Sequence, residues 1–196
     1  MKNKNAFTLI ELLIVVAIIA VLAAIAVPNF LEARTRSKVS RVQADMRTAG
    51  IALEAYCVDA GVYPPCYVGR QALDWSLRLL PLTTPVTYIT NYHVLKDVFN
   101  FDEFDQDNLL YNPEKIFPYL NRKPFANFDV PEFSDGSWLV LWDEDPESLY
   151  FRRQWALFSY GPDSDFDVHR NARTLANVYD ASNGTVSSGD LYRAGP

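Results

Sequence analysis

Three alternating carboxylates near the C-terminus form a pattern suited to a metal ion. Asp163, Asp165 and Asp167 share one short segment, and alternating carboxylates in a loop suit a hard cation with oxygen ligands. An EF-hand is excluded, because its sixth position holds Val168 rather than Gly and its twelfth holds Thr174 rather than Glu. Two interpretations remain for this segment, a divalent cation site and a solvated acidic turn.

The chain carries no pattern typical of catalysis. It contains no G-x-S-x-G, no H-E-x-x-H, no phosphate-binding loop and no G-x-G-x-x-G. Its only histidines, His93 and His169, are isolated from one another and from the cysteines. We therefore expect both to be surface or structural residues and the protein not to be an enzyme.

A long apolar run follows a basic start that contains Lys2 and Lys4. Residues 12–27 include no polar side chain, and adding residues 7–11 gives about 21 residues, close to the length that crosses a bilayer as a helix. One interpretation is a secretory signal peptide with a small-x-small cleavage site at residues 24–26. Another is a plain single-pass anchor.

Glu11 fits neither interpretation, because a carboxylate within an apolar run costs about 2.5–3.5 kcal/mol on insertion. A signal peptide or a simple anchor has no use for such a group. Close to the end of the helix its side chain could instead reach the membrane interface.

The string A-F-T-L-I-E-L-L-I at residues 6–14 resembles the type III signal of type IV pilins and type II secretion pseudopilins. This resemblance implies that a prepilin peptidase cuts between Ala6 and Phe7 and methylates the new amine of Phe7. Ala6 stands where the family usually has Gly. Glu11 and Pro28 then become the fifth and twenty-second residues of the mature chain, where the family places its Glu and its helix-kinking Pro.

A physical role for Glu11 follows from that cleavage. A buried carboxylate needs a partner, and cleavage creates a cation at Phe7. Within one helix the two groups lie about 6 Å apart along the axis. A neighbouring copy shifted by that rise would bring its amine opposite Glu11, so the pair would set the assembly register. A solvated or interfacial Glu11 is the alternative.

Beyond Pro28 the pattern becomes amphipathic. Apolar residues recur at helical spacings of three and four and share one face, and they are Val39, Val42, Met46, Ala49, Leu53 and Tyr56. Gly61 is a suitable residue beyond the helix end. We predict one helix from about residue 7 to residue 58, about 75 Å long, bent or locally melted at Pro28.

The segment A-Y-C-V-D-A-G-V-Y-P at residues 55–64 looks like the Y-x-x-D-x-G-x-Y-P segment that ends this helix in major pseudopilins. This second resemblance favours the secretion branch of the family.

The remainder, residues 59–196, is predicted to form a globular, β-rich head. Residues 138–142 and 149–160 indicate a hairpin with its turn at Pro146. Residues 67–137 are interpreted as a variable insert, within which residues 85–137 show no clear periodicity. The predicted fold class is α+β, with the second half of a long N-terminal helix packed on a small antiparallel sheet.

The two cysteines, Cys57 and Cys66, lie nine residues apart across the predicted helix end. A chain exported beyond the membrane meets oxidising conditions, so a disulfide between helix and head is favoured. Free thiols and metal ligation are the alternatives.

The segment S-x-G-P-D that ends at Asp163 is similar to the calcium loop of major pseudopilins, which a second acidic residue closes further along the chain. The resemblance implies Ca²⁺ held by Asp163, Asp165, Asp167 and Asp190. The solvated turn remains the alternative.

Charge is distributed unevenly along the chain. The formal net charge is −6, with 7 basic and 4 acidic side chains in residues 1–58 and 11 and 20 in residues 59–196. This balance argues against a nucleic-acid binder that works through bulk positive charge, and no nucleic acid is expected as a partner.

These features together predict a filament subunit with four regions. They are a leader (1–6), a transmembrane and assembly helix (7–28), an amphipathic helix (29–58) and the head (59–196). The resemblance implies homo-oligomers, a prepilin peptidase, an inner-membrane assembly platform, minor pilins and lipid as partners.

The resemblance also implies a bacterial inner-membrane location, with a single span and the head in the periplasm, and then a periplasmic or extracellular filament. Charge alone predicts the opposite orientation, because four basic residues between residues 34 and 41 follow the span and only two precede it. We let the resemblance decide the orientation. The main interpretation is a type II secretion pseudopilin. The alternatives are a type IV pilin for adhesion, motility or DNA uptake, and a membrane-anchored periplasmic enzyme or ligand-binding protein.

Overall fold

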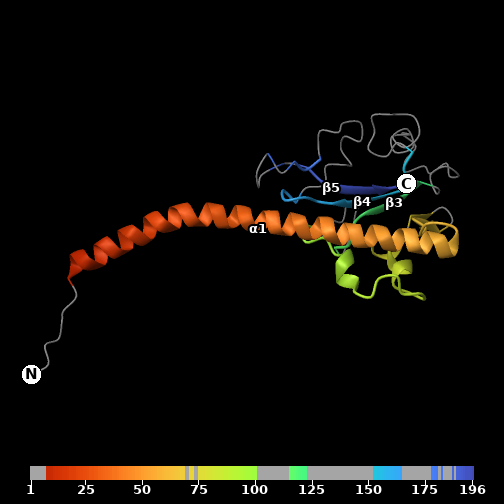
Figure 1. Ribbon diagram of the computed structural model, residues 1–196, viewed down its shortest axis with the longest axis horizontal. Coiled ribbons are helices and arrows are strands. Elements are labelled where there is room, and N and C mark those ends of the chain that lie inside the picture. The colour runs from red at the N-terminus through yellow and green to blue at the C-terminus, as the bar shows by residue number, and fades with distance from the viewer. Residues whose placement is uncertain are drawn as a thin grey trace, which may run out of the picture.

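A computed structural model shows a long helix that carries a small head at its C-terminal end (Figure 1). It describes residues 8–68, 71–72, 75–100, 115–122, 152–164, 178–180, 182, 187 and 189–196.

The helix α1 runs without a break over Leu9–Ala60, 52 residues, or about 78 Å. Thr8 caps its N-terminus, and Gly61 ends it in the left-handed conformation (φ 72°), where its N–H donates to the carbonyl of Cys57 at 2.8 Å. Pro28 lies inside the helix. The predicted helix is thus confirmed, and Figure 1 shows a gentle bend over its N-terminal half rather than a melted turn.

Five strands are described in the head. A three-stranded antiparallel sheet has the order β3 (Tyr119–Asn121), β4 (Trp155–Ser159), β5 (Leu191–Gly195). A separate two-stranded antiparallel pair joins β1 (Tyr67–Val68) to β2 (Gln71–Ala72). The α+β class predicted from the sequence is confirmed.

The predicted hairpin is confirmed only as a strand within residues 149–160, namely β4. Its intended partner, residues 138–142, lies outside the described residues. In the structure β4 pairs instead with β3 on one edge and with β5 on the other. The central strand therefore joins segments that lie far apart in sequence.

Short helices from the predicted insert cover the other side of α1. They are α2 (Trp75–Arg78) and the 3-10 helices η1 (Leu80–Leu82) and η2 (Tyr92–Leu95). Figure 1 shows the sheet on one side of α1 and these pieces on the opposite side. The segment predicted as an insert thus supplies part of the core, including Leu79, Leu82, Leu95 and Phe117.

One hydrophobic core joins α1 to both layers. The apolar face predicted for α1 is confirmed, because Val39, Val42, Met46, Ala49 and Leu53 are buried. Tyr56 is partly buried and packs against the same core. Helix α1 therefore has two parts, the exposed half (Leu9–Leu31) and the packed half (Val39–Ala60).

Candidate functional site

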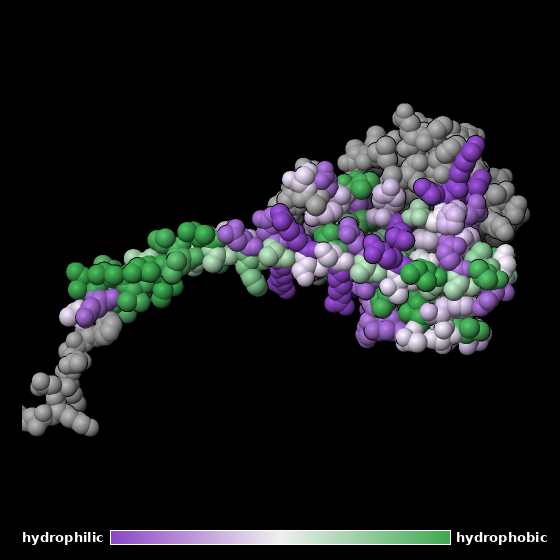
Figure 2. Space-filling model, viewed as in Figure 1, coloured by the Kyte–Doolittle hydropathy of each residue, from purple (hydrophilic) through white to green (hydrophobic). Residues whose placement is uncertain are grey.

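The exposed half of α1 is the most unusual surface in the described part of the chain. Every large apolar side chain from Leu9 to Leu31 is between 46 % and 82 % exposed. Figure 2 shows this half as a continuous hydrophobic stretch that projects away from the head. It satisfies the length and composition expected of a membrane-spanning helix, and none of its most apolar part is buried in this chain.

Glu11 lies at the N-terminal end of this surface, within a capping box. The backbone N–H of Thr8 donates to Glu11 Oε2 at 2.9 Å, and the N–H of Glu11 donates to Thr8 Oγ1 at 3.3 Å. The helix begins directly after Thr8, so the bond between Ala6 and Phe7 precedes the cap. Both of those residues lie outside the described part of the chain.

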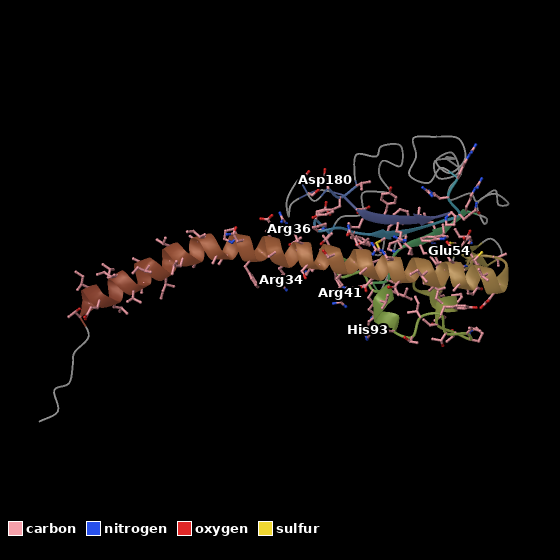
Figure 3. The ribbon with its side chains drawn as sticks, viewed as in Figure 1. Arg34, Arg36, Arg41, Glu54, His93 and Asp180 are labelled. Atoms are coloured by element: carbon pink, nitrogen blue, oxygen red, sulfur yellow. The ribbon has the colours of Figure 1, made fainter. Side chains whose placement is uncertain are left out.

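Glu54 anchors the packed half of α1 to the head. Its Oε1 accepts from the indole N–H of Trp155 on β4 at 2.7 Å, and its Oε2 accepts from the hydroxyl of Tyr63 at 2.9 Å. Figure 3 shows Glu54 on α1 beside the sheet. One carboxylate therefore ties the helix both to the central strand and to the segment that leaves the helix.

The ring of Trp155 fits between two glycines. A Cβ on Gly50 of α1 would lie 2.9 Å from the ring, and a Cβ on Gly195 of β5 would lie far inside van der Waals contact with it. Because neither position carries a side chain, the indole can lie flush between helix and sheet. The junction thus depends on backbone approach as well as on the Glu54 hydrogen bonds.

The segment at residues 55–64 makes several contacts at the end of α1. Tyr56 packs edge-on against Tyr88 with ring centroids 5.6 Å apart, and Tyr88 donates its hydroxyl to Asp59 at 2.9 Å. Gly61 supplies the left-handed cap described above. The carbonyl of Pro64 accepts from the hydroxyl of buried Tyr119 at 3.2 Å. These residues lock the end of α1 onto the head.

The predicted disulfide is not formed in this structure, where Cys57 and Cys66 are both free thiols. The thiol of Cys66 is fully buried and donates to the carbonyl of Tyr119 at 3.7 Å. Burial raises the pKa of Cys66 to about 11. Cys57 lies half-buried on α1. The thiol of Cys66 is thus engaged by the sheet rather than by the cysteine of the helix.

A buried carboxylate, Asp97, joins the η2 segment to the end of β4. It accepts from the hydroxyl of Ser159 at 2.8 Å and from the N–H groups of Tyr160 and Phe99 at 2.9 and 3.0 Å. Burial raises the pKa of Asp97 to about 6 against the lowering effect of these hydrogen bonds. Asp97 is therefore a group whose protonation is coupled to head stability.

Of the four carboxylates predicted to bind a cation, two lie among the described residues. Asp163 Oδ2 accepts from the N–H of Gly189 at 3.0 Å, and Asp190 is the next residue and is buried. Gly161 is left-handed (φ 69°) and packs against the carbonyl of Gly189. The structure thus brings these two segments to one corner.

Asp165 and Asp167 lie outside the described residues. Within the part that is described, no group of three or more His, Cys, Asp or Glu side chains could hold a metal ion. His93 is exposed on η2, as expected, and His169 is not described.

Charged side chains surround α1 where its two halves meet. Arg36 pairs with Glu32, and Arg41 pairs with Asp45 at 3.5 Å. Figure 3 shows Arg36 on the sheet side of α1 and Arg34 and Arg41 on the opposite side. The surface of α1 therefore changes from apolar to charged before the helix reaches the head.

Sequence reasoning missed the residues that carry the junction. Glu54 and Trp155 lie 101 positions apart, and no periodicity links them. Glu54 lies outside the apolar face that Leu53 belongs to, so its place in the sequence gave no signal for the junction. Asp97 likewise lay within residues that showed no pattern.

The chain is similar to known proteins, and the matched family model covers its N-terminal part. The family model described as the prokaryotic N-terminal methylation motif matches residues 1–27. The type IV wide pilus major component PilA4 of Thermus thermophilus is 43 % identical over 88 residues, which make up 45 % of this chain and 64 % of that protein.

Two further relatives represent both branches of the resemblance. The type IV major fimbrial protein FimA of Dichelobacter nodosus is 44 % identical over 66 residues, 34 % of this chain and 41 % of that protein. The type II secretion system core protein G of Pseudomonas aeruginosa is 35 % identical over 72 residues, 37 % of this chain and 51 % of that protein. No solved structure matches the chain.

These matches confirm the resemblance drawn from residues 6–14. The N-terminal segment of the chain is similar to those of type IV pilins and type II secretion pseudopilins and carries the prokaryotic N-terminal methylation motif. The aligned regions span between about two-fifths and two-thirds of these three relatives' own lengths.

Proposed function

We propose that this protein is the structural subunit of a pilus-like filament that polymerises through its N-terminal helix to support protein export. The observation that carries this proposal is the exposed half of α1, which is apolar on all sides and has nothing in its own chain to pack against. Such a surface needs lipid or other copies of itself. A filament core of bundled helices would cover it.

Processing would prepare the helix for assembly. A prepilin peptidase would cut between Ala6 and Phe7 and methylate Phe7, which leaves a cationic amine two residues before the start of α1. Glu11 would exchange its contact with Thr8 for the amine of a neighbouring copy, because an ion pair satisfies a carboxylate in an apolar surrounding better than a hydroxyl does. Pro28 would allow the exposed half to bend as copies pack.

Before assembly the exposed half would lie in the bacterial inner membrane as a single span, with the head in the periplasm. Its 23 residues extend about 34 Å, which matches the hydrocarbon thickness. Extraction into a periplasmic or extracellular filament would require an inner-membrane assembly platform and minor pilins.

A type IV pilin is a second candidate function. It is favoured by the match to the wide pilus component of Thermus thermophilus, which covers the largest share of this chain among the three relatives described above. The segment at residues 55–64 favours the secretion branch. Long surface filaments in cells with normal expression would select the pilin, and loss of secreted proteins on deletion would select the pseudopilin.

Filament assembly by a matched pair of variants tests the main proposal. Glu11→Ala should abolish filaments seen by electron microscopy and leave the head folded, because the carboxylate acts between copies. Glu32→Ala removes a carboxylate from the same helix, where it is exposed and paired with Arg36, and should leave assembly intact. Equal filament yields from both variants would refute the role of Glu11.

We further propose Ca²⁺ at the corner formed by Asp163 and Asp190, with Asp165 and Asp167 as additional ligands. Its support is the approach of residues 161–163 to residues 189–190 and the supply of carboxylate oxygens, which suits Ca²⁺. Bound calcium would tie the last strand to the end of β4.

Calcium should raise the free energy of unfolding by about 2.7 kcal/mol at a concentration 100-fold above its dissociation constant. Thermal unfolding with calcium and then with chelator measures this difference. Asp165→Ala should reduce it without removing the hydrogen bond that Asp163 makes to Gly189. An unchanged melting temperature on chelation would rule the site out.

A further inference from the structure

A small pocket lies between α1 and β5, at the edge of the sheet. Its volume is about 200 Å³, and its lining residues come in equal numbers from the two elements, Gln43, Met46 and Arg47 from α1 and Leu191, Tyr192 and Arg193 from β5. Met46 and Leu191 are buried and provide an apolar backing. The remaining four can all donate hydrogen bonds.

Two positive charges line this pocket. Arg47 and Arg193 are both exposed, and within the described residues neither guanidinium forms an ion pair. Arg193 Nε lies 3.0 Å from the position that a Cβ on Gly50 would take, so its side chain lies against α1 within one turn of Arg47. Like charges held near an apolar backing repel, and an anion between them would relieve that repulsion.

The size of the pocket limits what that anion can be. Pockets for cofactors and drug-sized ligands enclose roughly 300–1,000 Å³, so this one is too small for a nucleotide. It fits the carboxylate of a side chain. The planar fork of a guanidinium matches a carboxylate in a bidentate geometry.

Lipid phosphate is not the expected occupant. Arg47 lies 16 residues beyond the last residue of the exposed half, which is about 24 Å along the helix axis. The interfacial region extends only about 5–8 Å beyond the hydrocarbon edge. The pocket therefore lies at the level of neighbouring heads rather than of the membrane surface.

We propose that this pocket binds a carboxylate side chain from the head of a second copy of this chain. Charge complementarity supports this occupant, because residues 59–196 carry 11 basic and 20 acidic side chains. Two runs within residues 102–107 and 143–147, which lie outside the described residues, each hold four carboxylates. The inference rests on the proposed function, since a filament brings one head against the helix of the next.

Photo-crosslinking in cells that express the full chain with its assembly machinery tests this inference. A photoreactive amino acid at Gln43 should give a dimer adduct that mass spectrometry maps to an acidic run of the second copy. Arg47→Gln and Arg193→Gln should each lower the adduct yield about tenfold, as expected for the loss of one charged hydrogen-bonding group. Arg34→Gln, which changes an exposed arginine of α1 outside the pocket, should leave the yield unchanged.

Thermal unfolding of each variant shows whether its head is folded, and Arg47→Lys, which keeps the charge, should restore part of the yield. An adduct to a different protein would overturn the inference, and so would an adduct yield that neither arginine substitution lowers. Filaments that form without any adduct would also overturn it and leave the proposed function standing. An adduct in cells that form no filaments would instead support the pocket and count against the filament.

Discussion

The two halves of α1 show how one helix can serve two environments. Leu22 in the exposed half is 62 % exposed, whereas Leu53 in the packed half is fully buried. Both belong to the same unbroken helix. The difference comes from the pattern of the neighbours, since apolar residues surround the first half completely and form only one face of the second.

This comparison teaches that the helix is stabilised differently along its length. The packed half is held by the core, by Glu54 and by the cap at Gly61. The exposed half has only its own backbone hydrogen bonds and the capping box of Thr8 and Glu11, so its environment must come from lipid or from other copies. Mutations in the two halves should therefore affect different measurements.

The largest effect should come from truncating a leucine in the packed half. Leu53→Ala should lower the free energy of unfolding of the head by about 2–5 kcal/mol, because it opens a cavity in the core. Leu22→Ala should change the same quantity by less than about 0.5 kcal/mol. Chemical unfolding of the full chain in detergent micelles compares them, and similar losses in both variants would break the distinction between the halves.

A pH effect should follow from Asp97 in the head. Because its pKa is raised to about 6 when folded and is near 3.8 when unfolded, the folded state binds the proton more tightly. Head stability should therefore fall by roughly 2–3 kcal/mol as pH rises from 4 to 7 and then level off, on account of this group.

Asp97→Asn should remove that pH-dependent loss, whatever it does to overall stability. Unfolding curves at several pH values give the slope of the free energy of unfolding against pH for the wild type and for the variant. An identical slope in the variant would show that Asp97 does not titrate in this range.

Glycine substitutions sharpen the account of how the packed half meets the sheet. Gly195→Ala should cost about 1–3 kcal/mol, because its methyl group would collide with the ring of Trp155. Gly61→Ala should cost about 1 kcal/mol, since the position has open space and only its left-handed backbone is unfavourable for alanine. The melting temperatures of the two variants show which substitution destabilises the head more. A larger loss of stability for Gly61→Ala would contradict the packing described for Trp155.

The smallest effect, one of reactivity rather than stability, concerns the cysteines. Cys57 should react with an alkylating reagent in the folded protein, whereas buried Cys66, with its raised pKa, should react only after unfolding. Adding a reductant should make no difference. If reductant alone exposed both thiols, a disulfide would be present after all.

Much of α1 could be predicted because its determinants are local. The spacing of Val39, Val42 and Met46 identified the packed face, and Gly61 identified the end of the helix. The exposed half followed from its length and composition alone. The same local reasoning located one strand of the head, β4.

The sheet and the junction could not be predicted in this way, since their partners are distant in sequence. The strand β4 pairs with segments that start at Tyr119 and Leu191 rather than with a hairpin neighbour. The pairing of Glu54 with Trp155 depends on that sheet. The roles of the 55–64 segment likewise became clear only once the positions of Tyr88 and Tyr119 were known.

The central claim is that the exposed half of α1 stays in the mature protein and is covered by other copies. Intact-mass and N-terminal mass spectrometry of the protein recovered from sheared filaments tests this most directly. The mature chain should begin at a methylated Phe7 and so retain the whole of α1. A chain that begins at Val27 and is found only in the soluble fraction would show an ordinary secretory signal and contradict the filament account.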